Sequence, residues 1–311
     1  MTSLVAWCLF DGKPGHENQV MGLVNALGSL ISLNPYFFEA RTSILNWTLG
    51  RFPPGHTLPD PDLLVGAGHG THIPLITARR VRGGRIVLLM NPSLPTAWFD
   101  MCIIPEHDQP RPASNILLSR GTLSRIRPCP QQHDKRGLVL IGGPSRNYVW
   151  SDVSVIEQVR NVIRANPDWR WTLTTSRRTP LSFLQCLHTG SGAANENLEL
   201  PDMALDIVTW PDTGPEWVFE QLREARRVWV TEESVSMVYD ALTVGAEVGL
   251  ISVPKSRSGR VARGVQRLVE DGLVMPFECW RQGQELRPRT ETFDEAARCA
   301  LWVRDQCLSD H

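Results

Sequence analysis

The sequence has no apolar run of the roughly 18 residues that a membrane-spanning helix needs. No basic segment precedes its first apolar stretch, which reads MTSLVAWCLFDGKPG, so we interpret that stretch as a strand and not as a signal peptide. The seven cysteines are scattered, without a C-x-x-C pair. Such an odd, unclustered set is typical of a reducing compartment, and we expect a cytoplasmic protein with buried thiols.

Net charge is also nearly absent, because 32 basic residues face 33 acidic ones. This balance predicts no nucleic-acid partner. The only D-x-D, Asp60 and Asp62, precedes a predicted strand instead of following it, so we expect no metal site. The glycine-rich segment 63–71 resembles a dinucleotide loop, but no acidic residue follows the next strand, 85–90. We therefore expect no bound cofactor.

What is present is a globular composition, 42% apolar over 311 residues, which is enough for two domains. Residues 226–254 show the repeating unit most clearly: a short apolar strand, a polar turn, an amphipathic helix and a second apolar strand. This βαβ pattern predicts that the polar turn lies at the carboxyl end of a sheet, where open α/β sheets bind ligands.

The polar turn in this unit suits a nucleotide. A helix N-terminus there favours phosphate, with Ser234 and Ser236 as ligands. Glu232 or Glu233 could accept hydrogen bonds from ribose hydroxyls. The alternative is helix capping, since Ser and Glu are common in a first helical turn.

Two other predicted strand ends in the second half also suit phosphate. After the strand 137–141, glycines and a hydroxyl can form an anion nest, although no Gly-Lys-Ser/Thr follows as in a Walker A loop. After the strand 170–174, hydroxyls and two arginines suit a diphosphate, which arginine binds bidentately. The residues concerned are Gly142, Gly143, Ser145, Ser176, Arg177 and Arg178.

The first half carries imidazoles and carboxylates at its predicted strand ends. Asp11, His16 and Glu17 follow the strand 5–10, where we expect a turn at 12–15 and a helix led by Asn18. His107, between Glu106 and Asp108, follows the strand 101–104. A histidine beside carboxylates can accept a proton near neutral pH. The alternative for both segments is a polar surface loop.

The remaining segments indicate where the two expected lobes begin and end. Residues 29–62 look irregular, and 121–135 look like a linker. A helix at about 260–270 has arginines outside, which we interpret as a solvated face, with an anionic membrane surface as the alternative. We expect an N-terminal lobe over 1–128, a C-terminal lobe over 136–290, and a terminal segment 291–311 whose helix crosses back to the first lobe.

Five motifs in this chain are DGKPGHENQVMGL, FDMCIIPEHD, VLIGGPSRNYVW, TTSRRTP and VTEESVSMVYDAL. Together they resemble the "elongated mitochondria" family of mitochondrial fission, whose bacterial members are described as glycosyltransferases of the two-lobed GT-B type. They span most of the chain in the expected order. One departure is Asp240, where the family pattern has Glu. A carboxylate is kept there, but it is shorter.

The resemblance implies an α/β fold with two Rossmann-like lobes and a cleft between them. It further implies a metal-independent glycosyltransferase that moves a sugar from a nucleotide-sugar to a hydroxyl acceptor, in a context such as cell-envelope glycan synthesis. The second lobe would hold the nucleotide-sugar, and the first lobe would hold the acceptor and supply a base from Asp11, His16, Glu17, His107 or Asp108. The alternatives are a nucleotide-sugar epimerase and a non-catalytic recruitment protein on the same shell. Peripheral contact with the inner membrane is the alternative to a purely cytoplasmic location.

Overall fold

The computed structural model describes residues 3–39, 49–130, 133–189, 205–214, 216–256, 259–288 and 291–308. Residues 131 and 132 of the predicted linker lie outside these ranges. The chain divides into two compact units. Unit 1 comprises Met1–Arg125 and Asp294–His311, and unit 2 comprises Ile126–Phe293.

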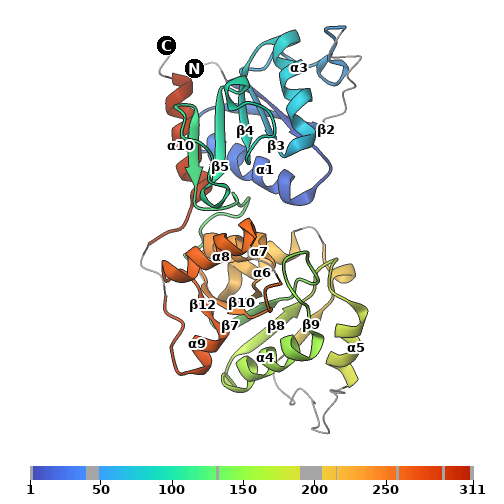
Figure 1. Ribbon diagram of the computed structural model, residues 1–311, viewed down its shortest axis with the longest axis vertical. Helices are drawn as coiled ribbons and strands as arrows, with labels where there is room; N and C mark the ends of the chain where they lie inside the picture. The colour runs from blue at the N-terminus through green and yellow to red at the C-terminus, as the bar shows by residue number, and fades with distance from the viewer. Residues whose placement is uncertain are drawn as a thin grey trace. The chain divides into compact units, whose positions relative to one another are not determined.

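Unit 1 has a six-stranded parallel sheet in the order β2-β1-β3-β4-β5-β6. Figure 1 labels β2, β3, β4 and β5 of this sheet. The strands are β1 (Leu4–Phe10), β2 (Leu33–Glu39), β3 (Leu63–Ala67), β4 (Arg85–Leu89), β5 (Met101–Pro105) and β6 (Ile116–Ser119). The helices are α1 (Pro14–Gly28), α3 (His72–Arg82) and α10 (Glu295–Leu308), with short 3-10 turns η1 (Pro53–Gly55), η2 (His69–Thr71), η3 (Thr96–Trp98) and η4 (Glu106–Asp108).

Two details of unit 1 differ from the sequence-based expectation. Helix α1 begins at Pro14, four residues before Asn18, because proline is favourable at the first helical position, where no N–H partner is needed. The segment 29–62 contains an edge strand, β2, despite Pro35. An edge strand tolerates proline, since one side of its backbone has no strand to pair with.

The sheet of unit 1 is covered on both faces. On one face, α1 and α10 pack together over the strands, with Val24, Leu27, Ala300 and Val303 in the shared core. On the other face, α3 and the segment around Phe52 cover a second apolar cluster. The final helix of the sequence is therefore part of the core of unit 1.

Unit 2 has a second six-stranded parallel sheet, in the order β12-β11-β10-β7-β8-β9. The strands are β7 (His133–Leu140), β8 (Arg170–Thr174), β9 (Leu205–Val208), β10 (Ala225–Thr231), β11 (Glu247–Ile251) and β12 (Met275–Pro276). The helices are α4 (Asp152–Arg164), α5 (Leu181–Thr189), α6 (Trp217–Glu224), α7 (Val235–Val244), α8 (Arg260–Glu270) and α9 (Phe277–Arg281), and η5 (Trp210–Asp212) is a 3-10 turn.

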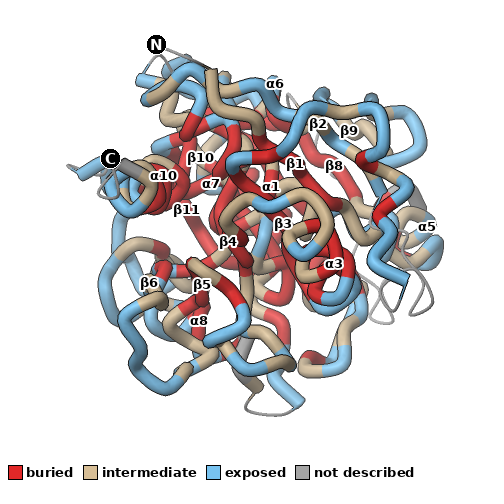
Figure 2. The backbone as a smooth tube through the Cα atoms, turned by 90° about the horizontal axis from the view of Figure 1, so that it is seen from above, coloured by how far each residue is buried: buried red, intermediate tan, exposed pale blue. Residues whose placement is uncertain are grey.

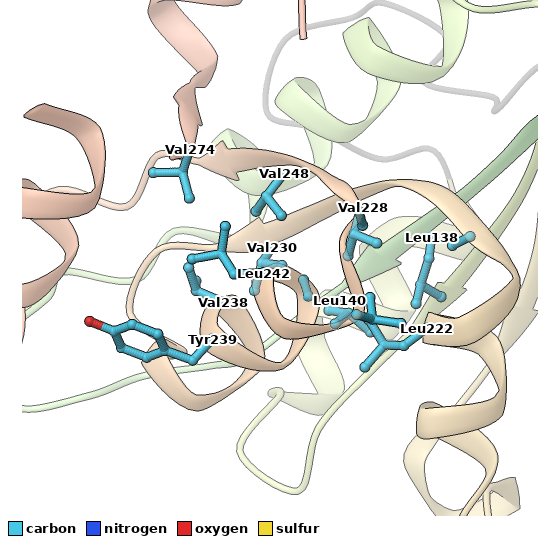
Figure 3. Packing of buried hydrophobic residues seen from close by; sticks show 14 of the residues in the cluster. Leu138, Leu140, Leu222, Val228, Val230, Val238, Tyr239, Leu242, Val248 and Val274 are labelled. Atoms are coloured by element: carbon cyan, nitrogen blue, oxygen red, sulfur yellow. The ribbon is translucent and has the colours of Figure 1, made fainter. Parts of the chain in front are cut away.

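The core of unit 2 also has two sides. Figure 3 shows one of them, where Leu222 of α6 and Leu242 of α7 pack against Val228 and Val230 of β10. The other side holds residues of α4, α5 and α9 around Trp171 and Trp229. Accordingly, the strands at the middle of both sheets are drawn as buried in Figure 2.

Both sheets are doubly wound, and each has one point where the strand order reverses. In unit 1, the chain continues from β1 to β2 on one side and from β3 to β6 on the other. In unit 2, β8 and β9 lie on one side of β7, and β10 to β12 lie on the other. The carboxyl ends of β1 and β3, and those of β7 and β10, are therefore the switch points at which such sheets bind ligands.

Candidate functional site

At the switch point of unit 2, the loop after β7 is joined to the loop after β10. Gly142 N donates to Thr231 Oγ1 at 2.8 Å, and Gly143 N donates to Glu233 Oε1 at 2.8 Å. A Cβ atom on Gly142 would lie 1.8 Å from Glu233 Oε1, so a side chain at this position would displace the carboxylate. The two glycines thus let the two loops approach within hydrogen-bonding distance.

Three buried polar atoms at the carboxyl end of this sheet have no hydrogen-bond partner within the described residues. They are Glu233 Oε2, Tyr148 Oη and Thr174 Oγ1. Burial raises the pKa of Glu233, while its bond to Gly143 and the charge of Arg178 oppose that shift. Burial, followed by the charges of Glu232 and Glu233, also raises the pKa of Tyr148. Buried polar atoms are almost always paired in native proteins, so unpaired ones at the carboxyl end of such a sheet indicate a place for a ligand.

Arg178 connects these loops and stays partly open to solvent. Its guanidinium donates to the backbone oxygens of Gly143 and Pro144 at 3.3 and 3.4 Å, and to Ser234 Oγ at 3.4 Å. It also lies 3.6 Å from Glu233 Oε1, and 43% of its side chain is exposed. The exposed part of this guanidinium can bind an anion without breaking the loop contacts.

The other phosphate candidates lie on the same loops with different surroundings. Ser176 Oγ donates to Gly142 O at 2.9 Å, so the loop after β8 is fixed to the loop after β7. Ser145 follows this glycine pair and is half-buried, and Ser236 is exposed in the first turn of α7. Arg177 is exposed, and no group of the described residues pairs with it.

The two glutamates of the turn after β10 are both engaged within the protein. Glu232 Oε1 accepts from Val253 N at 2.9 Å, and Lys255 Nζ lies 3.7 Å from Glu232 Oε2. Burial raises the pKa of Glu232, against the opposing effect of those two partners. The side chain of Glu233 is fully buried, whereas 13% of that of Glu232 is exposed. Of the two, Glu232 is therefore the one that a ribose could reach in this conformation.

Ser234 tests the alternative that the polar residues of this turn only cap the helix. It is the N-cap residue of α7, yet its side chain accepts no hydrogen bond from the helix. Its hydroxyl instead accepts from Arg178. The first turn of α7 thus keeps backbone N–H groups that Ser234 does not cap, as an anion site requires.

At the switch point of unit 1, Asp11 and His16 form a pair. Asp11 Oδ2 lies 2.9 Å from His16 Nδ1, and Asp11 Oδ1 accepts from Lys13 N at 3.2 Å. A carboxylate can only accept, so His16 Nδ1 carries the proton of this bond and the neutral ring keeps a lone pair on Nε2. A histidine with this tautomer, oriented by an aspartate, is suited to act as a general base.

The loop after β3 lies directly against this pair. A Cβ atom on Gly68 would come within 2.2 Å of His16 Nδ1, and one on Gly70 within 2.9 Å of Asp11 Cβ. These glycines of the segment that resembled a dinucleotide loop therefore make room for the Asp11–His16 pair. This close approach is a structural reason for glycine at both positions.

Glu17 and His107 lie outside this pair. Glu17 is half-buried in the first turn of α1, where a carboxylate also interacts favourably with the helix dipole. His107 is in η4, after β5, and β4 separates β5 from β3 in the sheet. His107 is therefore not at the switch point of unit 1.

Sequence reasoning missed Thr231 and Tyr148 as site residues. The only available signal for Thr231 was a hydroxyl at the last position of a buried strand. Tyr148 lies in the loop after β7, and its buried hydroxyl could not be foreseen from an otherwise ordinary loop sequence.

Other features of the described residues concern metal binding, membrane spans and a large hollow. Within them, no three His, Cys, Asp or Glu side chains are grouped so as to hold a metal ion, and no helix is long and apolar enough to cross a membrane. A hollow of about 750 Å³ in unit 2 is lined by β11, β12, α9 and the segment 283–287, and it includes none of the site residues above.

Two doubly wound units, each with a polar cluster at its switch point, define a protein of the GT-B type. Solved structures agree with this fold. A protein assigned as a UDP-N-acetylglucosamine 2-epimerase from Listeria monocytogenes matches with a TM-score of 0.63 at 11% identity, covering 100% of this chain and 98% of that one. MurG from Acinetobacter baumannii matches with a TM-score of 0.54 at 10% identity, covering 98% of this chain and 99% of that one. A glycosyltransferase from Rickettsia africae ESF-5 matches with a TM-score of 0.52 at 7% identity, covering 100% of both chains.

The family follows from the sequence itself. The family model described as mitochondrial fission ELM1 matches residues 14–307. An uncharacterized protein of Rickettsia prowazekii (strain Madrid E) is 20% identical, over 87% of this chain and 90% of that protein. The chain belongs to the mitochondrial fission ELM1 family, which confirms the resemblance carried by the five motifs.

Proposed function

We propose that this chain is a glycosyltransferase that moves a sugar from a nucleotide-sugar to a hydroxyl acceptor. The observation that carries the proposal is the different chemistry of the two switch points. Unit 2 offers the backbone amides in the first turn of α7, hydroxyls and Arg178, which suit a diphosphate, whereas the amides of Gly142 and Gly143 are taken by Thr231 and Glu233. Unit 1 offers the Asp11–His16 pair, which suits removal of a proton.

In the proposed reaction, His16 Nε2 takes the proton of the acceptor hydroxyl. The oxygen of that hydroxyl bonds at the same time to the anomeric carbon of the sugar. The bond between that carbon and the diphosphate breaks, and the electron pair leaves with the diphosphate. Asp11 stabilises the imidazolium that forms, as a buried carboxylate partner does. Arg178 and the N-terminus of α7 stabilise the growing charge on the diphosphate, so this chemistry needs no metal ion.

Comparisons support a nucleotide-sugar as the donor substrate. A UDP-GlcNAc 2-epimerase from Neisseria meningitidis, solved bound to UDP-GlcNAc, has the same fold with a TM-score of 0.52 at 8% identity. Since similarity at this level concerns the fold alone, the choice of UDP is part of the proposal. We expect uridine diphosphate sugars to bind unit 2 more tightly than the GDP or CMP sugars.

A nucleotide-sugar epimerase is the second candidate, because several of the matched structures are UDP-GlcNAc 2-epimerases. The epimerase would use unit 2 in the same way but would need no acceptor. A sugar isomer formed from the nucleotide-sugar alone would favour this candidate. Release of UDP that depends on an added alcohol would favour transfer.

The test compares sugar-donor affinity with turnover in matched variants. Arg178→Ala should weaken nucleotide binding by about tenfold, as loss of a charge-assisted hydrogen bond does. Arg164→Ala is the control, because Arg164 is exposed in the last turn of α4 and does not lie at the carboxyl end of the sheet. His16→Ala should leave nucleotide affinity unchanged and lower turnover by roughly 10²–10⁴-fold. Equal loss of affinity in His16→Ala and Arg178→Ala would contradict the assignment of these two roles.

A further inference from the structure

A second histidine is carried by the loop that packs against the Asp11–His16 pair in unit 1. His69 occupies the position between Gly68 and Gly70, the two glycines that contact this pair. Its side chain is exposed, and its Nδ1 lies 2.7 Å from Ser93 Oγ in the loop after β4. The strands β1, β3 and β4 are consecutive in the sheet, so their loops place His16, His69 and Ser93 along one edge.

Ser93 is supported from behind by a buried ring. Ser93 Oγ lies 3.4 Å from Nδ1 of His72, which is 3% exposed and packs edge-on against Phe99 at 5.6 Å between ring centroids. Burial and the nearby His69 lower the pKa of His72 to about 4, so this ring is neutral at physiological pH. Upstream, Met90 turns the chain out of β4 with a φ of 77°, a conformation that non-glycine residues rarely adopt.

These contacts allow two proton arrangements, because the donor in each depends on the tautomer of the ring. In one of them, Ser93 donates to His69 Nδ1 at 2.7 Å, and His72 Nδ1–H donates the longer bond to Ser93 Oγ. The neutral ring of His69 then carries its proton on Nε2, which has no partner within the described residues.

We propose that His69 is a substrate-contacting residue, whose Nε2–H donates a hydrogen bond to a second hydroxyl of the acceptor, next to the hydroxyl that His16 deprotonates. His16 and His69 then present opposite proton roles on adjacent loops, one accepting and one donating. This pair suits an acceptor with neighbouring hydroxyls, as in a carbohydrate, better than one with a single hydroxyl. Ser93 and His72 are positioning residues. The inference rests on the proposed transferase function.

The first experiment measures the orientation of His69 directly. Side-chain ¹H–¹⁵N spectra of ¹⁵N-histidine-labelled protein should show His69 as a single Nε2–H tautomer at neutral pH. Ser93→Ala should let both tautomers appear, and Ser93→Thr, which keeps the hydroxyl, should restore the single form. A His69 tautomer that does not respond to Ser93→Ala would overturn the positioning role.

The second experiment measures binding with a panel of methyl glycosides of glucose, galactose, mannose and N-acetylglucosamine as probes. At least one should shift the His69 Nε2 resonance, and His69→Ala should weaken its binding by about threefold to tenfold, as expected for one neutral hydrogen bond. The proposal is wrong if none of the probes shifts this resonance, or if His69→Ala binds the panel as tightly as the native protein.

The two proposals fail in different ways. If glycosides bind at His69 but no nucleotide-sugar is turned over, the transferase assignment is wrong and the carbohydrate site stands. If transfer to a glycoside proceeds and His69→Ala leaves the KM for that glycoside unchanged, the transferase assignment stands and the role of His69 is wrong.

Discussion

Glu233, Gly142 and Gly143 depend on one another at the residue scale. The fully buried carboxylate of Glu233 is stabilised by the N–H of Gly143 and the hydroxyl of Thr231, at 2.8 and 3.1 Å. In return, the carboxylate holds the loop after β7 where any side chain on Gly142 would collide with it. In the sequence, the glycines look like phosphate ligands and Glu233 looks like a ribose ligand. In the structure, they bind one another and hold the two loops together.

His72 gives a prediction at the same scale. Its pKa falls from 6.5 to about 4 on folding, so between these values the unfolded chain binds a proton that the folded chain does not. Stability should therefore be complete above pH 6.5 and should fall as the pH drops towards 4, by at most about 3 kcal/mol from this residue. His72→Gln should reduce this pH dependence in urea unfolding measured from pH 4 to 7.5.

The control for this prediction is His56→Gln, because His56 is exposed at the end of η1. This variant should unfold with the same pH dependence as the native protein. If the free energy of unfolding of His72→Gln changed with pH as it does in the native protein, His72 would titrate normally in the folded state, and burial would not keep it neutral.

At the scale of elements, hydrophobic patterning located most strands and helices but not all of them. The strand Arg170–Thr174 was predicted with its observed bounds, because tryptophan and threonine favour strands and a polar segment follows. The edge strand β2 was missed, since its exposed positions and Pro35 resemble a loop. The short β12 and α9 carry too few residues for a period to be read.

The sequence indicated which loops carry the candidate site residues, but it did not indicate which of these residues contact one another. The rule that ligands bind at carboxyl strand ends selected Asp11, His16, Gly143 and Arg178, and the structure places these residues on, or in contact with, the loops at the two switch points. It could not distinguish His107, whose strand has the same local pattern, because strand order is decided by long-range pairing. For the same reason, the sequence could not show that Glu233 points inward.

Helix α4 supplies the element-scale prediction. Arg160 is 2% exposed, and within the described part of the chain none of its three guanidinium nitrogens has a hydrogen-bond partner. Burial lowers its pKa, with a smaller effect from Arg164. Because an unpaired buried charge is costly, Arg160→Met should raise the free energy of unfolding by about 1–3 kcal/mol.

Arg164→Met is the matched control, since Arg164 is exposed in the last turn of the same helix. There the change should stay within about 0.5 kcal/mol, as is usual for surface substitutions. Both variants can be compared by urea denaturation. A loss of stability in Arg160→Met would show that the guanidinium is paired in solution.

At the scale of the whole molecule, the two units do not follow the order of the chain. Unit 2 is one continuous segment, whereas unit 1 needs the last helix to complete its core. Each unit has its own sheet and its own apolar clusters on both faces. We therefore expect the units to unfold separately, with α10 contributing to the stability of unit 1 only.

A charge in α10 tests this expectation. Ala300 is fully buried against α1, so Ala300→Glu should destabilise unit 1 by about 3 kcal/mol or more, because a carboxylate would have to enter an apolar core. Leu301→Glu is the control one position away, where 41% of the side chain is exposed, and its effect should stay within about 0.5 kcal/mol. Hydrogen exchange followed by mass spectrometry can report both units at once. In Ala300→Glu, the amides of β1 should lose protection while those of β10 keep it. Equal loss of protection in both strands would show that the two sheets unfold as one cooperative structure.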